Sequence, residues 1–124
     1  MADIIKADLC IIGGGSGGLS VAAGAAQMGA KCVLVEKAKM GGDCLNTGCV
    51  PSKSLLAAAH TAHDARHGAR FGIDAGEVKA DFARVHDHVH GVIASIAPHD
   101  SVERFEELGV QVISAAAEFT GPRD

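Results

Sequence analysis

Apolar and polar residues alternate along the chain in blocks that predict strands and helices in turn. Residues 8–12 form a short apolar run that stops at glycines, which is typical of a buried strand in a parallel sheet. Residues 19–28 are apolar and rich in alanine, Gly29 follows as a helix-ending residue, and residues 31–36 form a second apolar run. We therefore predict a parallel β-α-β unit at the start of the chain.

Helical spacing of apolar residues predicts two longer helices further along the chain. Pro51 suits the first turn of one helix, which continues to about Arg66. The second helix runs from Asp81 to about Ala97, where Pro98 ends it. We interpret its apolar stripe as core, with packing across a dimer interface as the alternative.

The C-terminal part carries the signals of a short helix and a third strand. Asp100, followed three positions later by Glu103, resembles a capping box, and Gly109 closes the helix that it opens. Residues 110–113 then form another apolar run. The whole pattern predicts an α/β fold with a parallel sheet and flanking helices.

Composition and charge narrow the choice of function. The chain has 124 residues, of which 48% are apolar and 21% charged, as expected for a globular domain with a core. A net charge of -4 and the lack of a basic stripe argue against nucleic acid as a partner. No stretch reaches the roughly 20 apolar residues of a membrane span, and the start lacks the pattern of a secretion signal. We therefore expect a cytoplasmic protein without membrane contact.

The four cysteines fall into two groups. Cys10 and Cys32 lie inside apolar runs, so we expect both to be small buried core residues. Cys44 and Cys49 lie in a polar, glycine-rich stretch, and in a reducing compartment they are candidates for chemistry. Their spacing is too wide for a Cys-x-x-Cys pair, and the partners of a structural zinc site are missing.

Three glycines, Gly13, Gly15 and Gly18, fit the pattern G-x-G-x-x-G between a predicted strand and a predicted helix. In a dinucleotide-binding turn the first glycine permits the tight turn, the second lets a pyrophosphate approach, and the third lets helix and strand pack closely. Glu36, 18 residues after Gly18, would accept hydrogen bonds from a ribose hydroxyl. The motif predicts a dinucleotide but does not choose between NAD and FAD.

A disulfide between Cys44 and Cys49 requires a distorted chain between them. Residues five apart in a regular helix have Cα atoms roughly 8–9 Å apart, beyond the reach of a disulfide. Asn46 and Gly48 tolerate unusual backbone angles, and a bridge over so short a segment is easy to reduce. We expect the start of the following helix and Lys53 to lower the pKa of a nearby thiol. These features describe a redox-active dithiol.

Residues 41–53, which read GGDCLNTGCVPSK, resemble the redox signature of the pyridine nucleotide-disulfide oxidoreductases, a family that includes dihydrolipoamide dehydrogenase, mercuric reductase and glutathione reductase. The G-x-G-x-x-G motif stands at the matching distance upstream, so the resemblance covers the whole chain. Residues 98–104 and the Pro-Ser-Lys ending are most similar to the branch of dihydrolipoamide dehydrogenase and mercuric reductase. Asp43 and Ala115 depart from the pattern, because many members carry threonine and glycine there.

The resemblance implies FAD as the bound dinucleotide and NAD(P)H as a co-substrate of a longer parent enzyme. As the catalytic pair, Cys49 would lie beside the flavin and Cys44 would exchange with a small-molecule, lipoyl or other disulfide substrate. The implied cofactor-binding residues are Gly13, Gly15, Ser16, Gly17, Gly18, Glu36, Lys37, Gly42, Asp43, Cys44, Lys53 and Ala117.

The resemblance also implies a Rossmann-like FAD-binding domain, of which residues 1–124 are the N-terminal segment, in a homodimeric enzyme. The NAD(P)-binding and dimerisation domains are absent from these residues, so we expect the chain to be inactive by itself. Two alternatives stay open. One is a non-catalytic dinucleotide-binding or redox-sensing module, and the other is an NAD-only Rossmann domain with incidental thiols.

Seven histidines remain without an assigned role. His60, His63 and His67 share one predicted helix, and His86 and His90 share another at a spacing of four residues. This spacing suits metal ligation, but the polar faces of surface helices produce it too, and we expect no metal site.

Overall fold

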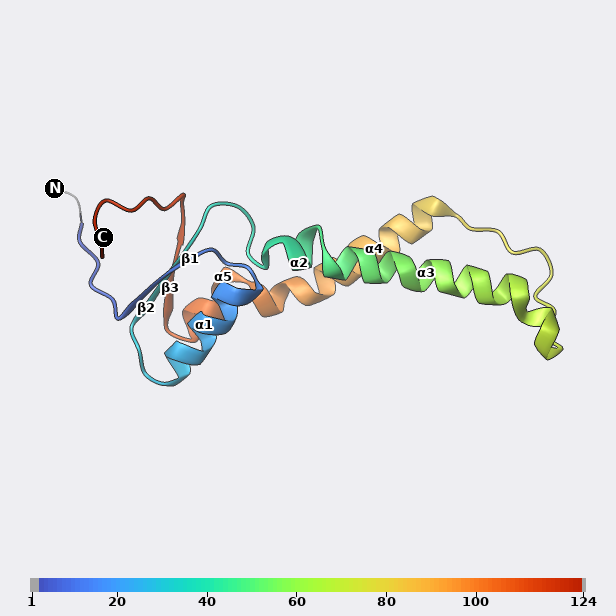
Figure 1. The fold of residues 1–124 in the computed structure, drawn as a ribbon, viewed down its shortest axis with the longest axis horizontal. Coiled ribbons are helices and arrows are strands. Elements are labelled where there is room, and N and C mark those ends of the chain that lie inside the picture. The colour runs from blue at the N-terminus through green and yellow to red at the C-terminus, as the bar shows by residue number, and fades with distance from the viewer. Residues whose placement is uncertain (1–2, 124) are drawn as a thin grey trace.

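In the computed structural model, which describes residues 3–123, the chain is an α/β protein of elongated shape (Figure 1). A parallel sheet with two helices forms one end, and a pair of long helices extends away from it. The elements in chain order are β1 (Leu9–Ile12), α1 (Ser16–Gln27), β2 (Cys32–Glu36), α2 (Gly42–Asn46), α3 (Cys49–His67), a 3-10 turn (Gly68–Phe71), α4 (Phe82–Ile96), a second 3-10 turn (Ala97–Asp100), α5 (Val102–Glu107) and β3 (Val110–Ser114). The predicted class, a Rossmann-like α/β fold with a parallel sheet and flanking helices, is confirmed.

The three strands pair in parallel in the order β1-β2-β3, so β2 is the central strand. Leu9 lies opposite Cys32, and Cys32 lies opposite Val110. The predicted β-α-β unit is present, with α1 between β1 and β2. The expectation of a fully buried first strand is wrong, because β1 lies at an edge of the sheet and only its Ile11 is buried.

The core lies on one face of the sheet, under α1 and α5. Ala22 of α1, Leu34 of β2 and Phe105 of α5 belong to it, with exposed fractions of 0%, 0% and 2%. Cys32 is part of the same cluster, as predicted. Cys10 is exposed, so the prediction of a buried core residue is wrong there. It alternates with Ile11 and therefore points to the opposite face, where neither α1 nor α5 packs.

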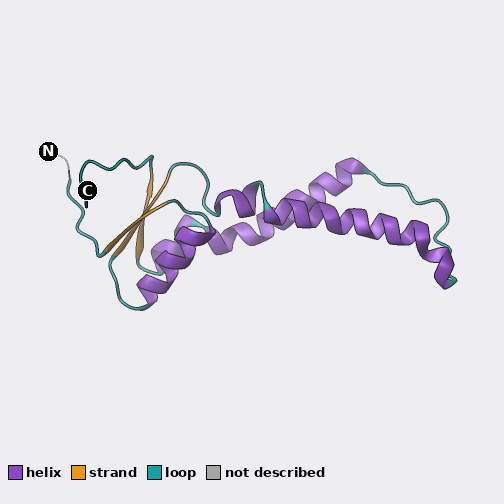
Figure 2. Cartoon of the chain, viewed as in Figure 1, coloured by secondary structure: helices purple, strands orange, loops and turns teal. Residues whose placement is uncertain are grey.

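The long helices α3 and α4 run antiparallel and pack against each other away from the sheet (Figure 2). Contrary to the prediction that its apolar stripe is core, α4 has no buried residue, and Phe82 at its start is 71% exposed. Val85 and Val89 are only half-buried beside α3. In a pair of helices the apolar side chains of each helix are covered by one partner helix only, so they stay partly exposed. Within residues 3–123, no helix is long and apolar enough to cross a membrane.

Side-chain caps fix the starts of two helices. Asp81 Oδ1 accepts a hydrogen bond of 3.3 Å from the backbone N–H of Arg84 at the start of α4. At α5 the cap is Ser101, whose Oγ accepts a hydrogen bond of 3.3 Å from the N–H of Arg104. The expectation that Asp100 caps this helix is wrong by one residue, because Asp100 still belongs to the preceding 3-10 turn.

Candidate dinucleotide and dithiol site

The loop between β1 and α1 is shaped by glycines. Gly13 has a φ of +104°, in the left-handed region that favours glycine. A Cβ at Gly18 would lie 1.8 Å from the carbonyl oxygen of Gly13 and 3.3 Å from Cγ2 of Ile11. Gly18 therefore allows the first turn of α1 to pack directly on the end of β1, which leaves the free amides of that turn facing the loop.

Glu36, the last residue of β2, holds this loop with its carboxylate. Oε2 accepts a hydrogen bond of 2.6 Å from the N–H of Gly14, and Oε1 accepts one of 2.7 Å from the N–H of Ala38. The hydrogen bond from Gly14, followed by that from Ala38, lowers the pKa of Glu36 below its usual value of 4.5. Glu36 thus connects the glycine loop to the segment after β2. The sequence predicted only a contact with a ribose for Glu36 and did not predict this structural role.

We predict that Glu36→Gln makes the free energy of unfolding less dependent on pH in the acidic range. Because the folded-state pKa is lowered, the ionised carboxylate stabilises the fold above about pH 4.5, and this contribution is lost as the pH falls through the lower folded-state value. Urea unfolding between about pH 6 and pH 3 should therefore show a steeper loss for the parent chain than for Glu36→Gln. Glu107→Gln, an exposed carboxylate on α5, is the control and should follow the parent chain. Parallel curves for the parent and Glu36→Gln would contradict this role.

A second glycine loop, before α2, is pressed against the first. Gly41 and Gly42 have φ values of +90° and +58°. The N–H of Gly41 donates a hydrogen bond of 2.8 Å to the carbonyl oxygen of Gly14. A Cβ at Gly42 would lie 2.7 Å from Cα of Gly15, so the two loops meet backbone to backbone. Gly41 was not among the predicted site residues, although the adjacent glycine pair was a signal for such a close approach.

Predicted cofactor-binding residues from distant parts of the chain line neighbouring cavities. Gly15, Gly42 and Asp43 line a cavity of about 660 Å³ together with Glu36 and Lys37. Glu36 and Lys37 also line a second cavity, of about 290 Å³, together with Gly13 and Ala117. The fold therefore brings the first glycine loop, the end of β2, the start of α2 and the segment after β3 to one region.

Three further predicted residues occupy the starts of helices. Ser16 lines a third cavity, of about 300 Å³, together with Cys44. Gly17 lies beside Ser16 in the first turn of α1, and Lys53 lies on α3 five residues into the helix. His90 and Ile93 of α4, which also line the 660 Å³ cavity, were missed, because nothing in the sequence near them indicates which loop α4 reaches.

The chain between Cys44 and Cys49 is broken between two helices. Cys44 lies in α2, which ends at Asn46, and Cys49 is the first residue of α3. Gly48 has φ -116° and ψ -113°, and a Cβ there would lie 2.8 Å from the carbonyl oxygen of Asp43. The predicted distortion is therefore present and is centred on Gly48.

Asn46 contributes to this break through its side chain, and the expectation of unusual backbone angles there is wrong. Its Nδ2 donates hydrogen bonds of 2.8 Å to the carbonyl oxygen of Gly42 and 3.2 Å to that of Met40. Among residues 3–123, only glycines have a positive φ. Asn46 therefore closes the loop around α2 from within a regular helical conformation.

The thiols of Cys44 and Cys49 interact across the break. Both cysteines are free in this structure. A hydrogen bond with the Cys49 side chain is the main cause that raises the pKa of the Cys44 thiol, and the charge of Lys53 opposes the rise only weakly. The expectation of a lowered thiol pKa is therefore wrong for Cys44, because the sulfur of its neighbour outweighs the lysine. The arrangement can pass two electrons and two protons by joining the two sulfurs.

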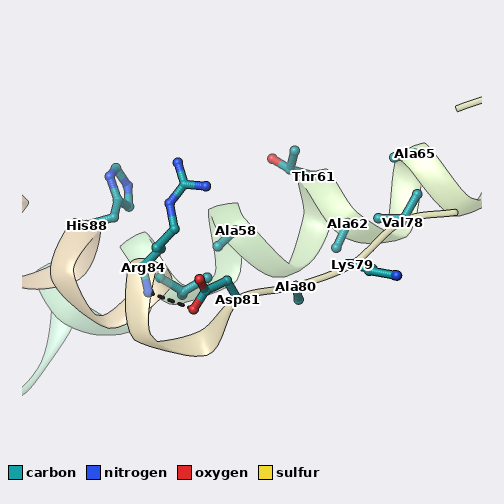
Figure 3. Close-up of a pocket in the computed structure, with 11 residues that line it drawn as sticks. Ala58, Thr61, Ala62, Ala65, Val78, Lys79, Ala80, Asp81, Arg84 and His88 are labelled. Carbon is teal, nitrogen blue, oxygen red and sulfur yellow. Dashed lines mark hydrogen bonds between the residues drawn. The ribbon is translucent and has the colours of Figure 1, made fainter.

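A separate cavity of about 380 Å³ lies between α3 and the segment that leads into α4 (Figure 3). Alanines of α3, such as Ala58 and Ala62, form one wall, and Arg84 and His88 of α4 lie on the other side. No residue predicted from the sequence to bind a cofactor or to react lines this cavity. It therefore does not belong to the dinucleotide and dithiol site.

Comparison with known proteins gives consistent matches. Residues 7–121 match the family model described as pyridine nucleotide-disulphide oxidoreductase. A dihydrolipoyl dehydrogenase of Geobacillus stearothermophilus is 41% identical over 92 residues, which cover 74% of this chain and 20% of that protein. Two dihydrolipoyl dehydrogenases of Bacillus subtilis are 45% identical over 72% of the chain and 36% identical over 93% of it. The chain spans about a fifth to a quarter of the length of these relatives, with shares of 20%, 19% and 25%.

Proposed function

The chain belongs to the pyridine nucleotide-disulphide oxidoreductase family, and from this premise we propose that it is the FAD-binding segment of an enzyme that exchanges electrons between NAD(P)H and a disulfide substrate. The observation that carries the proposal is the placement of Cys44 and Cys49 on either side of a helix break, beside cavities lined by the glycine loops and close enough for the Cys49 side chain to raise the pKa of the Cys44 thiol. The names of the relatives favour a dihydrolipoyl dithiol as the substrate over the mercuric ion. NAD(P)H binding and dimerisation are proposed to involve parts of the enzyme outside these residues.

The described residues fit FAD. The first turn of α1 carries no acidic residue, so its free amides and the helix dipole can hold a pyrophosphate beside Gly15. A Cβ at Gly15 would come no closer than 3.9 Å to other protein atoms, so that position is open to a ligand. Glu36 and Lys37 line both the 660 Å³ cavity and the 290 Å³ cavity. An adenosine diphosphate group bound here would place its two ends in these two cavities. Lys37 and Lys39 line the larger cavity together with Asp43, so their positive charge offsets the carboxylate that would otherwise repel a pyrophosphate.

The dithiol supplies the chemistry of the chain itself, and bound FAD would supply a two-electron carrier next to it. In the oxidised state a bond joins the sulfurs of Cys44 and Cys49, and two electrons with two protons convert it to two thiols. A substrate with two thiols can supply the same two electrons: one substrate thiolate attacks the sulfur of Cys44, forms a mixed disulfide and releases the sulfur of Cys49 as a thiolate. A second substrate thiolate then displaces Cys44 and leaves as the substrate disulfide. The raised pKa of Cys44 favours a proton on its sulfur once the substrate disulfide has left.

We predict that the 124-residue chain binds FAD and that Gly15→Val weakens this binding by about tenfold or more, because the new side chain occupies the approach to the amides of α1. Equilibrium dialysis with flavin absorbance measures the affinity directly. Gly24→Ala is the matched control on α1, since a Cβ at Gly24 meets no atom within 4 Å. Equal affinities of the parent chain and Gly15→Val for FAD, or no binding by the parent chain, would contradict the proposal.

A further inference from the structure

Two histidines of α4, His86 and His90, form a pair with converging rings. Their Nε2 atoms are 3.0 Å apart, while the ring centroids are 4.2 Å apart and the ring planes are tilted by 49°. If the rings met end to end, the centroids would lie much farther apart than the nitrogens. The rings therefore lie side by side and approach each other at their Nε2 edges.

One Nε2 donates a hydrogen bond to the other when its tautomer carries the proton there, and with both protons on Nδ1 the same approach suits two nitrogens that share one ion. Two imidazole nitrogens bound to one Zn²⁺ at roughly 2.0–2.1 Å lie about 2.9–3.4 Å apart for angles between square and tetrahedral. The separation of 3.0 Å between His86 and His90 falls within this range.

A carboxylate lies on the other side of one ring. Asp87 Oδ1 is 3.8 Å from Nδ1 of His86, on the ring edge away from His90. Histidines that bind metals commonly direct the second ring nitrogen to a carboxylate, which fixes the tautomer and leaves Nε2 free for the ion. At 3.8 Å Asp87 does not hydrogen-bond to His86, but its negative charge lies on the Nδ1 side of the ring and favours the tautomer that carries the proton on Nδ1.

The chain offers a comparison pair with the same spacing and a different geometry. The rings of His63 and His67 on α3 stack with centroids 4.1 Å apart and planes only 26° from parallel. Stacked planes keep the ring nitrogens pointing in parallel directions rather than toward one point. The Nδ1 of His67 also lies 2.7 Å from the carbonyl oxygen of His63. A spacing of four residues alone therefore does not produce converging nitrogens.

From these observations we infer that His86 and His90 bind a divalent transition-metal ion of the class that imidazole prefers, Zn²⁺, Ni²⁺ or Cu²⁺. No group of three or more metal-binding side chains comes together in the described part of the chain, so water completes the coordination. The pair lies at the edge of the site described above: His90 lines the 660 Å³ cavity with Gly15, and His86 lines a cavity of about 260 Å³ with Pro51 of α3. The inference does not depend on FAD or on the dithiol reaction.

Isothermal titration with Zn²⁺ tests the inference, in the full chain with Cys10, Cys44 and Cys49 replaced by serine so that thiolates do not compete for the ion. We expect one Zn²⁺ per chain and a loss of affinity of about tenfold or more in His86→Ala and in His90→Ala, because each variant leaves a single imidazole. His88→Ala, whose ring lines the separate cavity of Figure 3, and the double variant His63→Ala/His67→Ala should keep the affinity within about twofold.

Electron paramagnetic resonance with Cu²⁺ as the probe gives a second readout. We expect nitrogen coupling from two imidazoles in the serine-substituted chain and from one in either single variant, with unchanged helix content by circular dichroism. Absence of Zn²⁺ binding, unchanged affinity in both His86→Ala and His90→Ala, or loss of binding in the His63→Ala/His67→Ala variant would overturn the inference.

Discussion

Serine in place of Cys44 or of Cys49 removes the two-electron disulfide couple of the chain completely. The structure places the two cysteines on either side of the break between α2 and α3, where the Cys49 side chain raises the pKa of the Cys44 thiol, and Cys10 and Cys32 are also free. With glutathione disulfide as oxidant, two thiols of the chain become one disulfide and two glutathione thiols are released. Because the bridge closes a short segment, we expect its potential to lie above about -300 mV, within reach of glutathione buffers.

The measurement is a titration in glutathione buffers of graded potential, followed by alkylation and peptide mass spectrometry. We expect a linked peptide containing Cys44 and Cys49 in oxidised samples of the parent chain and none in either serine variant. Cys10→Ser is the control, since Cys10 is exposed on the other face of the sheet and should leave the couple unchanged. A couple that survives in Cys49→Ser, or that involves Cys10, would exclude the proposed pair.

Gly18→Ala is the substitution that we expect to destabilise the fold most. Its Cβ would lie 1.8 Å from the carbonyl oxygen of Gly13, which is backbone and cannot move without displacing α1 from β1. Overpacking in a well-packed region usually costs about 1–3 kcal/mol, and contact with rigid backbone places this variant at the upper end or beyond. Urea unfolding followed by circular dichroism measures the loss.

Gly24→Ala is the matched comparison, because it adds the same methyl group to the same helix. A Cβ at Gly24 meets no atom within 4 Å, so the gain in helix propensity should stabilise the chain by up to about 1 kcal/mol. Opposite signs for Gly18→Ala and Gly24→Ala would establish that the contact with Gly13 decides the effect. Equal unfolding midpoints for Gly18→Ala and the parent chain would show that the loop adapts and that Gly18 is not required.

Local signals along the sequence predicted the three strands, the longer helices and the glycine-rich turn into α1. The apolar runs gave β1, β2 and β3, and the glycines of residues 13–18 marked the turn into α1, because such signals act within a few neighbouring residues. The cap of α5 was placed one residue early, since Asp100 and Ser101 are both capping residue types. The break between Cys44 and Cys49 was also predictable, because Gly48 stands between them.

Burial and ionisation were harder to predict because they depend on contacts between distant segments. Cys10 lies in an apolar run and is exposed, since only one face of the sheet is packed by α1 and α5. His90 lines the 660 Å³ cavity together with Gly15 because of how α4 packs, and no local sequence pattern indicates this packing. The pKa of Cys44 rises because the hydrogen bond with the Cys49 side chain has a larger effect on it than the charge of Lys53. The relative size of these two effects depends on the folded geometry, which the sequence does not indicate.

The central claim is that Cys49 lies against a bound flavin while it forms and breaks a disulfide with Cys44. The most direct measurement is the absorbance spectrum of the FAD-loaded chain during titration with two electron equivalents of dithionite. We predict a new charge-transfer band at wavelengths beyond the flavin absorbance, present in the parent chain and absent in Cys49→Ser. A loaded chain that is fully reduced at its thiols and shows no such band, or a band that persists in Cys49→Ser, would contradict the claim.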